Sequence, residues 1–227
     1  MCDTGEMQQR SDTWVVIPAF NEAPVIGGVI AGVRALFPRV LVVDDASGDD
    51  TAALARSAGA YTAVHPLNLG QGAALQTGFD AALARGARYV VTFDADGQHD
   101  PADAAAMVDR ARREDLAFVL GSRFLDGGGA QVGVLKRALL RFGAMAAHAR
   151  TGMALTDTHI RADALAHVRL TQGRMAHASQ IVSQLAGCGL PGAEHPVTIS
   201  YTDYSRAKGQ PLLNSVNIIV DLVLGER

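Results

Sequence analysis

The first 125 residues alternate between short apolar runs and amphipathic segments, and this alternation limits the fold more than any other feature. The apolar runs are rich in β-branched residues, as in WVVI at residues 14–17. Strands and helices that alternate in this way predict βαβ units, with a parallel sheet between helices on both faces. We expect strands within residues 14–17, 38–47, 61–66, 88–96 and 116–124, and helices within 22–37, 48–60, 70–87 and 100–114.

The sequence changes in character after Phe124. A glycine-rich loop at 125–133 precedes a basic amphipathic helix at 134–152. Residues 157–170 and 174–190 are expected to be helical, 193–210 to be a strand that runs into a polar loop, and 211–227 to be a terminal helix. No second-domain boundary is evident, so we expect one domain over 13–210, in which a half at 126–210 is built onto a half at 13–125.

Composition limits the environment and the partners. The net charge of −3 without blocks of like charge argues against nucleic-acid binding. Two cysteines, a polar N-terminus and no long uncharged apolar stretch predict a cytoplasmic protein. The basic helix is expected either to rest on the inner face of the plasma membrane or to pack on the domain. The apolar segment 212–224 is expected to pack on its own chain or on a second subunit in a homodimer.

Polar residues follow the predicted strands at the point where each strand ends. The loops at the carboxyl ends of parallel strands carry the functional residues of such sheets. Four polar clusters meet this condition: 18–22, 44–47, 94–98 and 121–123. The sequence therefore predicts one site along one edge of the sheet.

The segment VVTFDADGQHDP, residues 90–101, contains the candidate metal ligands. Asp94, Asp96 and Gln98 offer hard oxygen atoms that suit Mg²⁺ or Mn²⁺. Acidic residues are also common at a helix N-terminus, and for Asp100, which precedes Pro101, capping is the favoured interpretation.

Other strand ends offer candidate anion or nucleotide contacts. Asp44 and Asp45 follow the second strand, where they are expected to contact a ligand or to cap the next helix. Gly70 and Gly72 open a helix, where free backbone N–H groups attract anions. Two arginines could pair with phosphate oxygens, although a surface role is open for the second: these are Arg123 and Arg161.

Five ordered motifs together resemble the family 2 inverting glycosyltransferases with the GT-A fold, and in particular the polyprenyl-phosphate mannose and glucose synthases. They are VVIPAFNEA, VLVVDDASGDDT, NLGQGAALQTGF, VVTFDADGQHDP and GSRF, and they cover residues 13–125. DTHIRAD and AEHPVTISYTDYSRAKGQ extend the resemblance more loosely to about residue 210.

The resemblance implies a reaction and roles for named residues. A sugar passes, with inversion, from a nucleoside diphosphate sugar to a lipid-phosphate or glycan acceptor, with Mg²⁺ or Mn²⁺ at the diphosphate. The implied nucleotide-sugar contacts are Pro18, Ala19, Asn21, Glu22, Asp45, Gly70, Gly72, Asp94 and Ala95. The metal ligands would be Asp94, Asp96 and Gln98, and the catalytic residues would be Arg123 and Arg161 at the phosphates and Asp157 as a base or acceptor-orienting acid.

Three departures from the family pattern keep other functions open. Gln71 replaces a lysine, the segment before Arg161 is shortened, and Gln180 stands where an acid often heads the late helix. A non-catalytic relative that binds a nucleotide or a partner is therefore one alternative. A sugar nucleotidyltransferase is less favoured, because PAFNEAPVIGG contains no lysine or arginine.

Overall fold

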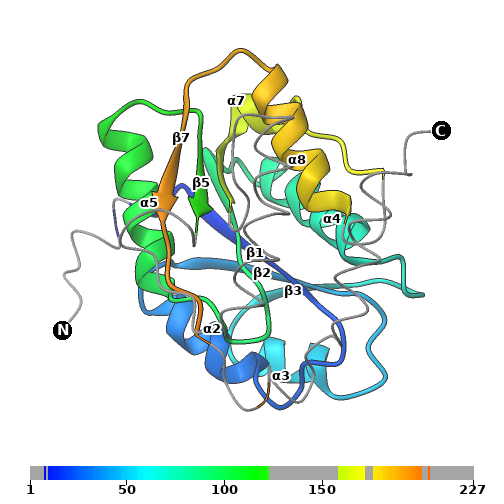
Figure 1. Ribbon diagram of the computed structural model, residues 1–227. Coiled ribbons are helices and arrows are strands. Elements are labelled where there is room, and N and C mark those ends of the chain that lie inside the picture. The colour runs from blue at the N-terminus through cyan, green and yellow to red at the C-terminus, as the bar shows by residue number, and fades with distance from the viewer. Residues whose placement is uncertain (1–7, 9, 123–157, 172–175, 201–203, 205–227) are drawn as a thin grey trace, which may run out of the picture.

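A seven-stranded sheet forms the centre of the protein (Figure 1). The computed structural model describes residues 8, 10–122, 158–171, 176–200 and 204. The strand order is β3-β2-β1-β4-β6-β5-β7, and β6 alone among them runs antiparallel to its neighbours. The strands are β1 (Thr13–Ala19), β2 (Arg39–Asp44), β3 (Tyr61–Val64), β4 (Tyr89–Thr92), β5 (Phe118–Ser122), β6 (Thr158–Arg161) and β7 (Gly192–Pro196).

Helices cover both faces of this sheet. One face packs against α2 (Ile26–Arg34), α3 (Thr51–Ser57) and α5 (Pro101–Arg113). The other face packs against α4 (Gln71–Leu83), α7 (Ala162–Leu165) and α8 (Ala176–Gly187). Figure 1 shows α4 and α8 together on the right of the sheet, while α2 and α5 lie on the left and below.

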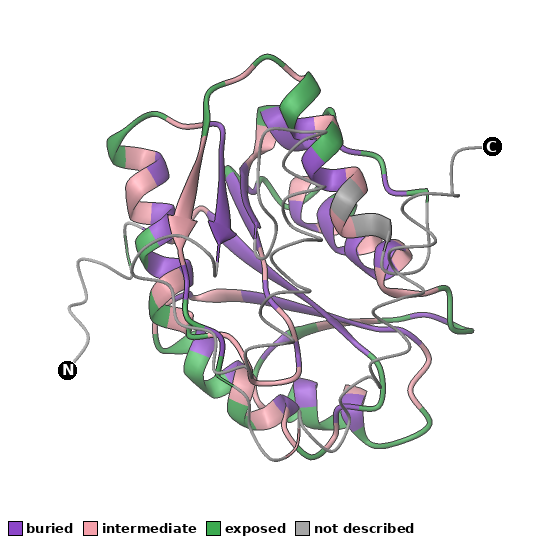
Figure 2. Ribbon diagram, in the orientation of Figure 1, coloured by how far each residue is buried: buried purple, intermediate pink, exposed green. Residues whose placement is uncertain are grey.

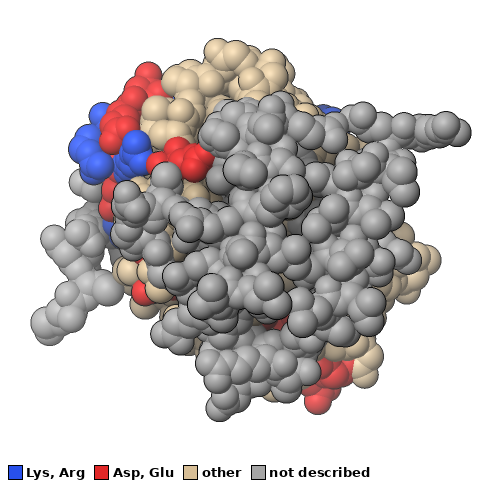
Figure 3. All heavy atoms as spheres, in the orientation of Figure 1, with Lys and Arg blue, Asp and Glu red and all other residues tan. Residues whose placement is uncertain are grey.

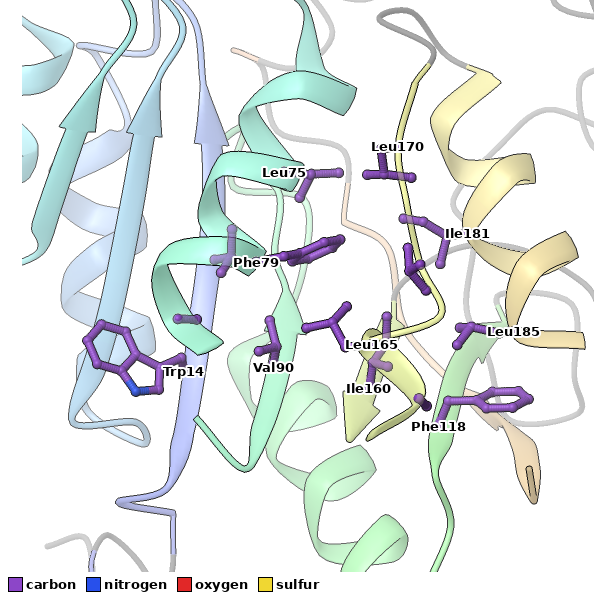
Figure 4. Close-up of a cluster of buried hydrophobic side chains, with 14 of the residues drawn as sticks. Trp14, Leu75, Phe79, Val90, Phe118, Ile160, Leu165, Leu170, Ile181 and Leu185 are labelled. Atoms are coloured by element: carbon purple, nitrogen blue, oxygen red, sulfur yellow. The ribbon is translucent and has the colours of Figure 1, made fainter. Parts of the chain in front are cut away.

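The two faces explain why the strands read as continuous apolar runs. In β1, Trp14 and Val16 point into the core beneath α4 and α8, whereas Val15 and Ile17 point into the core beneath α2 and α5. The five inner strands are accordingly buried along most of their length, whereas the edge strands β3 and β7 are partly exposed (Figure 2). In the core beneath α4 and α8, Leu75 and Phe79 of α4 face Ile181 and Leu185 of α8. Leu165 and Leu170 lie between them (Figure 4).

Helix α4 lies unusually close to β1. A Cβ atom at Gly78 would lie 2.2 Å from Cγ1 of Val16, so this position in the helix requires glycine. The close contact fixes α4 against the central strand. The start of α4 lies at the carboxyl edge of the sheet, beside the loops that follow β2 and β4.

The structure corrects one predicted helix. Residues 157–170 were expected to be helical, but Thr158–Arg161 form strand β6 and only Ala162–Leu165 form a short helix. β6 pairs with β4 on one side and β5 on the other, so its backbone groups are satisfied by neighbours distant in sequence. Pairing on both sides outweighs the local helical pattern.

The remaining predicted elements within the described residues are confirmed. The fold is a mostly parallel α/β sheet with helices on both faces, and α8 and β7 lie where the sequence predicted a helix and a strand. The expected helices at 134–152 and 211–227 lie outside the described residues. Within the described part of the chain, none of the helices combines the length and the apolar character that crossing a membrane demands.

Candidate functional site at the carboxyl edge of the sheet

The loops after β1 and β2 are joined by hydrogen bonds. Asn21 adopts a left-handed φ of 54°, which turns the chain sharply after β1. Its backbone N–H donates to Oγ of Ser47 at 2.9 Å, and its side-chain oxygen accepts from the N–H of Gly48 at 2.8 Å. Asparagine tolerates this backbone region better than most residues, which explains its place here.

A second set of bonds holds Glu22 against the same loop. The N–H of Glu22 donates to Oγ1 of Thr51 at 2.8 Å, and the N–H of Ala23 donates to Asp49 at 3.2 Å. Asp49 also accepts from the N–H of Thr51 at 3.0 Å, and these hydrogen bonds lower the pKa of Asp49 although burial opposes them. Asp49 therefore satisfies the first backbone N–H of α3, beside the N-cap residue Asp50.

Asp44 holds the turn that follows β2 and does not cap the next helix, since α3 begins at Thr51 and its N-cap is Asp50. The Asp44 carboxylate accepts from the hydroxyl of Ser47 and, at 3.3 Å, from the N–H of Ser47. The residue is buried at the end of β2. Asp44 thus closes the turn that presents Ser47 to Asn21.

Asp45 is held by three groups of the protein itself. Its Oδ1 lies 2.7 Å from Nδ1 of His65 and 2.9 Å from the backbone nitrogen of Leu69, and its Oδ2 accepts from Gly70 at 2.7 Å. The other nitrogen of His65 lies 2.9 Å from Oγ1 of Thr77 in α4. Asp45, expected as a nucleotide contact, therefore also holds the loop between β3 and α4 in place.

The predicted glycines lie at the start of α4. Gly70 precedes the helix with a φ of 91°, a conformation that favours glycine. Gly72 is buried in the first turn. Between them, Gln71 donates from Nε2 to Oδ1 of Asp94 at 3.2 Å, so the residue that replaces the family's lysine touches the acidic loop.

The acidic loop after β4 is compact. Asp96 accepts from the N–H of Gln98 at 3.0 Å, and Gly97 has a φ of 73° that allows the tight turn. Nε2 of His99 lies 3.3 Å from Oδ2 of Asp94, a side chain that is 45% exposed. Ala95 is buried, and Asp100 accepts from the N–H of Ala102, which confirms that Asp100 caps α5.

The raised pKa of Asp96 indicates that a cation would bind favourably beside this side chain. Burial raises the pKa of Asp96, and the nearby charge of Asp94 raises it further. A divalent cation would offset both effects, and the oxygens of Asp94, Asp96 and Gln98 are of the type that Mg²⁺ and Mn²⁺ prefer. In the described residues, no group of three or more His, Cys, Asp or Glu side chains is arranged as a metal site, so the amide of Gln98 or other ligands would be required.

Arg161 does not join this site. Its partner in the β4–β6 pairing is Tyr89, five residues before Asp94, which corresponds to about 16 Å along the sheet. Arg161 instead binds both carboxylate oxygens of Asp163 and one oxygen of Asp115, each at 2.8–2.9 Å. The expectation that Arg161 faces the donor phosphates finds no support in this arrangement, because β6 runs antiparallel and ends at the opposite edge.

The histidines His99 and His159 have different surroundings. His99 belongs to the acidic loop, as described above. His159 is fully buried in β6, where its ring stacks on Tyr89 at 5.2 Å between centroids and neither nitrogen has a hydrogen-bond partner among the described residues. Burial, with a smaller contribution from the charge of Arg112, lowers the pKa of His159 to about 3. His159 is therefore a neutral core residue.

Sequence reasoning missed His65 and Tyr204. His65 directly follows β3 at the same carboxyl edge, a position that could have been found by the rule used for the other loops. The hydroxyl of Tyr204 lies 2.9 Å from Oε2 of Glu22, a contact over 182 residues that no local pattern reveals. The expected catalytic residues Arg123 and Asp157 lie outside the described residues.

Comparison with known sequences identifies relatives along most of the chain. The pattern of the family Glycosyl transferase family 2 matches residues 14–166. An uncharacterized protein of Methanocaldococcus jannaschii is 30% identical over 95% of this chain and 92% of its own length.

Two named enzymes are similar over a shorter stretch. The polyprenol monophosphomannose synthase of Mycolicibacterium smegmatis is 36% identical over 56% of this chain and 50% of its own length. The undecaprenyl-phosphate mannosyltransferase of Micrococcus luteus is 38% identical over 50% of this chain and 49% of its own. The match thus spans about half of each named enzyme.

Solved structures support the fold. Glucosyl-3-phosphoglycerate synthase from Mycobacterium tuberculosis, in complex with Mg²⁺ and uridine diphosphate, superposes with a TM-score of 0.70 over 96% of this chain and 80% of its own, at 21% identity. The mostly parallel sheet with helices on both faces is of the GT-A type. The family match over 14–166 and the named relatives make this chain a glycosyltransferase, and it belongs to glycosyl transferase family 2.

Proposed function

We propose that the protein transfers a sugar, with inversion, from a nucleoside diphosphate sugar to a lipid phosphate such as a polyprenyl phosphate, or to a glycan of the cell envelope or an exopolysaccharide. The observation that carries the proposal is the acidic loop Asp94–Gln98, which lies beside the loops after β1 and β2 at the carboxyl edge of the sheet. Similarity to enzymes named for polyprenol and undecaprenyl phosphates supports the lipid acceptor.

The nucleotide half of the donor would bind against the loops after β1 and β2. Pro18 and Ala19 are buried at the end of β1 and would form the floor of this region. Asn21 and Glu22 follow them in the chain and are held by the loop after β2. Asp45 would contribute the edge of the pocket while it fixes the loop that leads to Gly70 and Gly72.

The diphosphate would lie between the acidic loop and the start of α4. A bound Mg²⁺ or Mn²⁺, held by Asp94, Asp96 and Gln98, would neutralise the charge that develops on the leaving diphosphate. The backbone of Ala95 would approach the sugar, and the first turn of α4 would offer N–H groups and the positive end of its dipole. Arg123 and Asp157 stay proposed for the phosphates and for the acceptor.

A thermal-shift screen tests donor binding. The purified protein is heated with UDP-, GDP-, dTDP- and CDP-sugars, each with Mn²⁺ and with EDTA. A donor at about 100 times its Kd adds about 2.7 kcal/mol to the free energy of unfolding, which raises Tm by roughly 5–10 °C in a chain of this size. We expect one base to produce such a shift and EDTA to abolish it.

Transfer itself needs a second assay. The donor found in the screen is incubated with a polyprenyl phosphate or with an oligosaccharide acceptor, and the anomeric configuration of the product is read by NMR. A lipid-linked product with inverted configuration is the expected result. Donor binding without any transfer would instead indicate the non-catalytic relative that Gln71 and Gln180 left open, and no donor binding would contradict the proposal.

A further inference from the structure

The chain that follows β7 crosses the acidic loop. The N–H of Ser200 donates to the carbonyl of Gln98 at 2.9 Å, and Ile199 forms an antiparallel bridge with His99. The N–H of Thr198 donates to Oδ2 of Asp103 in α5 at 2.7 Å. Val197 and Ile199 are 2% exposed, so this stretch is anchored by apolar burial as well as by backbone bonds.

Tyr204, four residues further on, contacts the loop after β1. Its hydroxyl lies 2.9 Å from Oε2 of Glu22 and 3.3 Å from the backbone oxygen of Asn21. The shorter contact is a hydrogen bond from a neutral phenol to a carboxylate that is largely buried, since Glu22 is 9% exposed. The segment after β7 thus links the acidic loop to the loop expected to hold the nucleotide.

The surroundings of the hydroxyl come from three loops of the site. Burial, the hydrogen bond to Glu22 and the charges of Glu22, Asp49 and Asp96 raise the pKa of Tyr204 to about 12. Glu22 follows β1, Asp49 follows β2 and Asp96 follows β4. Tyr204 therefore stays protonated at neutral pH, and it supplies a proton to a region rich in acidic side chains.

We propose that Tyr204 is a positioning residue of the donor site, which holds Asn21 and Glu22 in the arrangement that receives the nucleotide. The inference rests on the proposed function. Without the phenol, the Glu22 carboxylate loses the hydrogen bond from Tyr204 and stays near Asp96 and the anionic nucleotide sugar, so both loops would rearrange before the nucleotide binds. The energy of that rearrangement would appear as weaker donor binding.

The fold does not depend on this one hydroxyl. The stretch 197–200 is fixed by its own burial and backbone bonds, and phenylalanine at position 204 keeps the ring. The effect is thus expected in binding and not in folding. We expect Tyr204→Phe to weaken binding of the nucleoside diphosphate about tenfold in the presence of Mn²⁺, as the loss of one hydrogen bond to a charged group does.

The experiment compares Tyr204→Phe with wild type and with Tyr61→Phe, a matched control on an exposed strand-edge tyrosine away from the site. Titration calorimetry gives Kd for the nucleoside diphosphate, steady-state kinetics give KM and kcat, and unfolding gives Tm. Tyr204→Phe should raise Kd and donor KM about tenfold with kcat and Tm nearly unchanged. Tyr61→Phe should match wild type.

A double-mutant cycle with Glu22→Gln separates positioning from general support. If Tyr204 acts through Glu22, the double variant binds no more weakly than Glu22→Gln alone. Three results would overturn the inference and leave the proposed function intact. They are additive losses in the double variant, a Kd of Tyr204→Phe within twofold of wild type, and a loss of affinity that merely follows a lowered Tm. Failure of wild type itself to bind any nucleotide would overturn both.

Discussion

The amino and carboxyl edges of the sheet differ in the groups that bind their acidic side chains. At the amino edge, acids are neutralised by arginine: Arg10 pairs with Asp109, Arg112 with Asp12, and Arg161 with Asp115 and Asp163. Figure 3 shows positive and negative side chains mixed at the upper left, near the end of α5, where Arg110 and Glu114 form a further pair.

At the carboxyl edge, acids are held by backbone N–H groups, hydroxyls, amides and imidazoles. Ser47 binds Asp44, His65 and the N–H of Gly70 bind Asp45, and Gln71 and His99 contact Asp94. The backbone N–H of Gly70, the hydroxyl of Ser47 and the amide of Gln71 fix the direction of a carboxylate and bring no positive charge to it. Among the described residues, the amino edge thus holds its acids in arginine ion pairs that serve stability, whereas the carboxyl edge positions its acids as a ligand site requires.

Among the substitutions that distinguish the two edges, we expect the largest effect from Asp96→Asn. Because the pKa of Asp96 is raised in the folded state, its charge opposes folding at neutral pH, and the amide should raise the stability of the metal-free protein. The same change should weaken Mn²⁺-dependent binding of the nucleoside diphosphate roughly 100-fold, about 2.8 kcal/mol. Calorimetry and urea unfolding measure the two effects.

The control for this prediction is Asp80→Asn, an exposed carboxylate near the end of α4 that pairs with Arg169. It should leave donor binding unchanged. If Asp96→Asn lowers stability and spares binding, as expected of an amino-edge acid, the distinction between the edges fails.

A smaller effect is expected from His159, a core residue of β6 that belongs to neither edge. His159 is neutral in the folded state with a pKa of about 3, whereas an unfolded histidine titrates near 6.5. The unfolded chain therefore binds a proton that the folded chain does not, and stability is full above pH 6.5 and falls as the pH is lowered toward 3. At pH 5 the loss is about 2 kcal/mol.

His159→Leu should remove this part of the pH dependence. The free energy of unfolding, measured in urea at pH 8 and pH 5, should then differ between the two pH values by about 2 kcal/mol less than in wild type. His167→Gln, an exposed histidine shortly after β6, serves as the control and should keep the wild-type slope. An unchanged slope in His159→Leu would show that the buried histidine does not control acid sensitivity.

The smallest effect is expected at the amino edge itself. Arg161→Gln breaks ion pairs with Asp115 and Asp163, both of which are more than half exposed. Pairs of this kind contribute about 0.2–1 kcal/mol each, so Tm should fall by a few degrees at most. Donor Kd and kcat should stay within twofold of wild type, and a marked loss of either would return Arg161 to the catalytic site.

The sequence predicts the βαβ part well because each strand and helix there is encoded locally. Val15, Val16 and Ile17 form a continuous β-branched run that predicts a buried strand from its own residues. The polar residues that follow mark the carboxyl end of this strand. Arg161 was not placed by this rule, because its expected contact with the phosphates came from the family resemblance, in a segment predicted to be helical. It ends a strand, but β6 is antiparallel, and strand direction is set by pairing with β4 and β5 and not by residues 158–161.

Local sequence patterns also did not predict contacts between residues that are far apart in the sequence. Asp45 was expected to contact a nucleotide, and nothing in VLVVDDAS reveals that His65, Leu69 and Gly70 would come back to its carboxylate. Tyr204 reaches Glu22 only because β7 pairs with β5 and directs the following chain across the acidic loop. Tertiary packing, which sequence periodicity does not encode, creates both contacts.

The most direct test of the central claim is a crystal structure grown with Mn²⁺ and the nucleoside diphosphate selected by the thermal-shift screen. The anomalous signal of manganese locates the ion without assumptions about its ligands. We expect a peak about 2.0–2.6 Å from carboxylate oxygens of Asp94 and Asp96, with the nucleotide against Asn21 and Glu22. Manganese and nucleotide bound elsewhere, with the loop 94–98 free of both, would contradict the assignment of the donor site to the carboxyl edge.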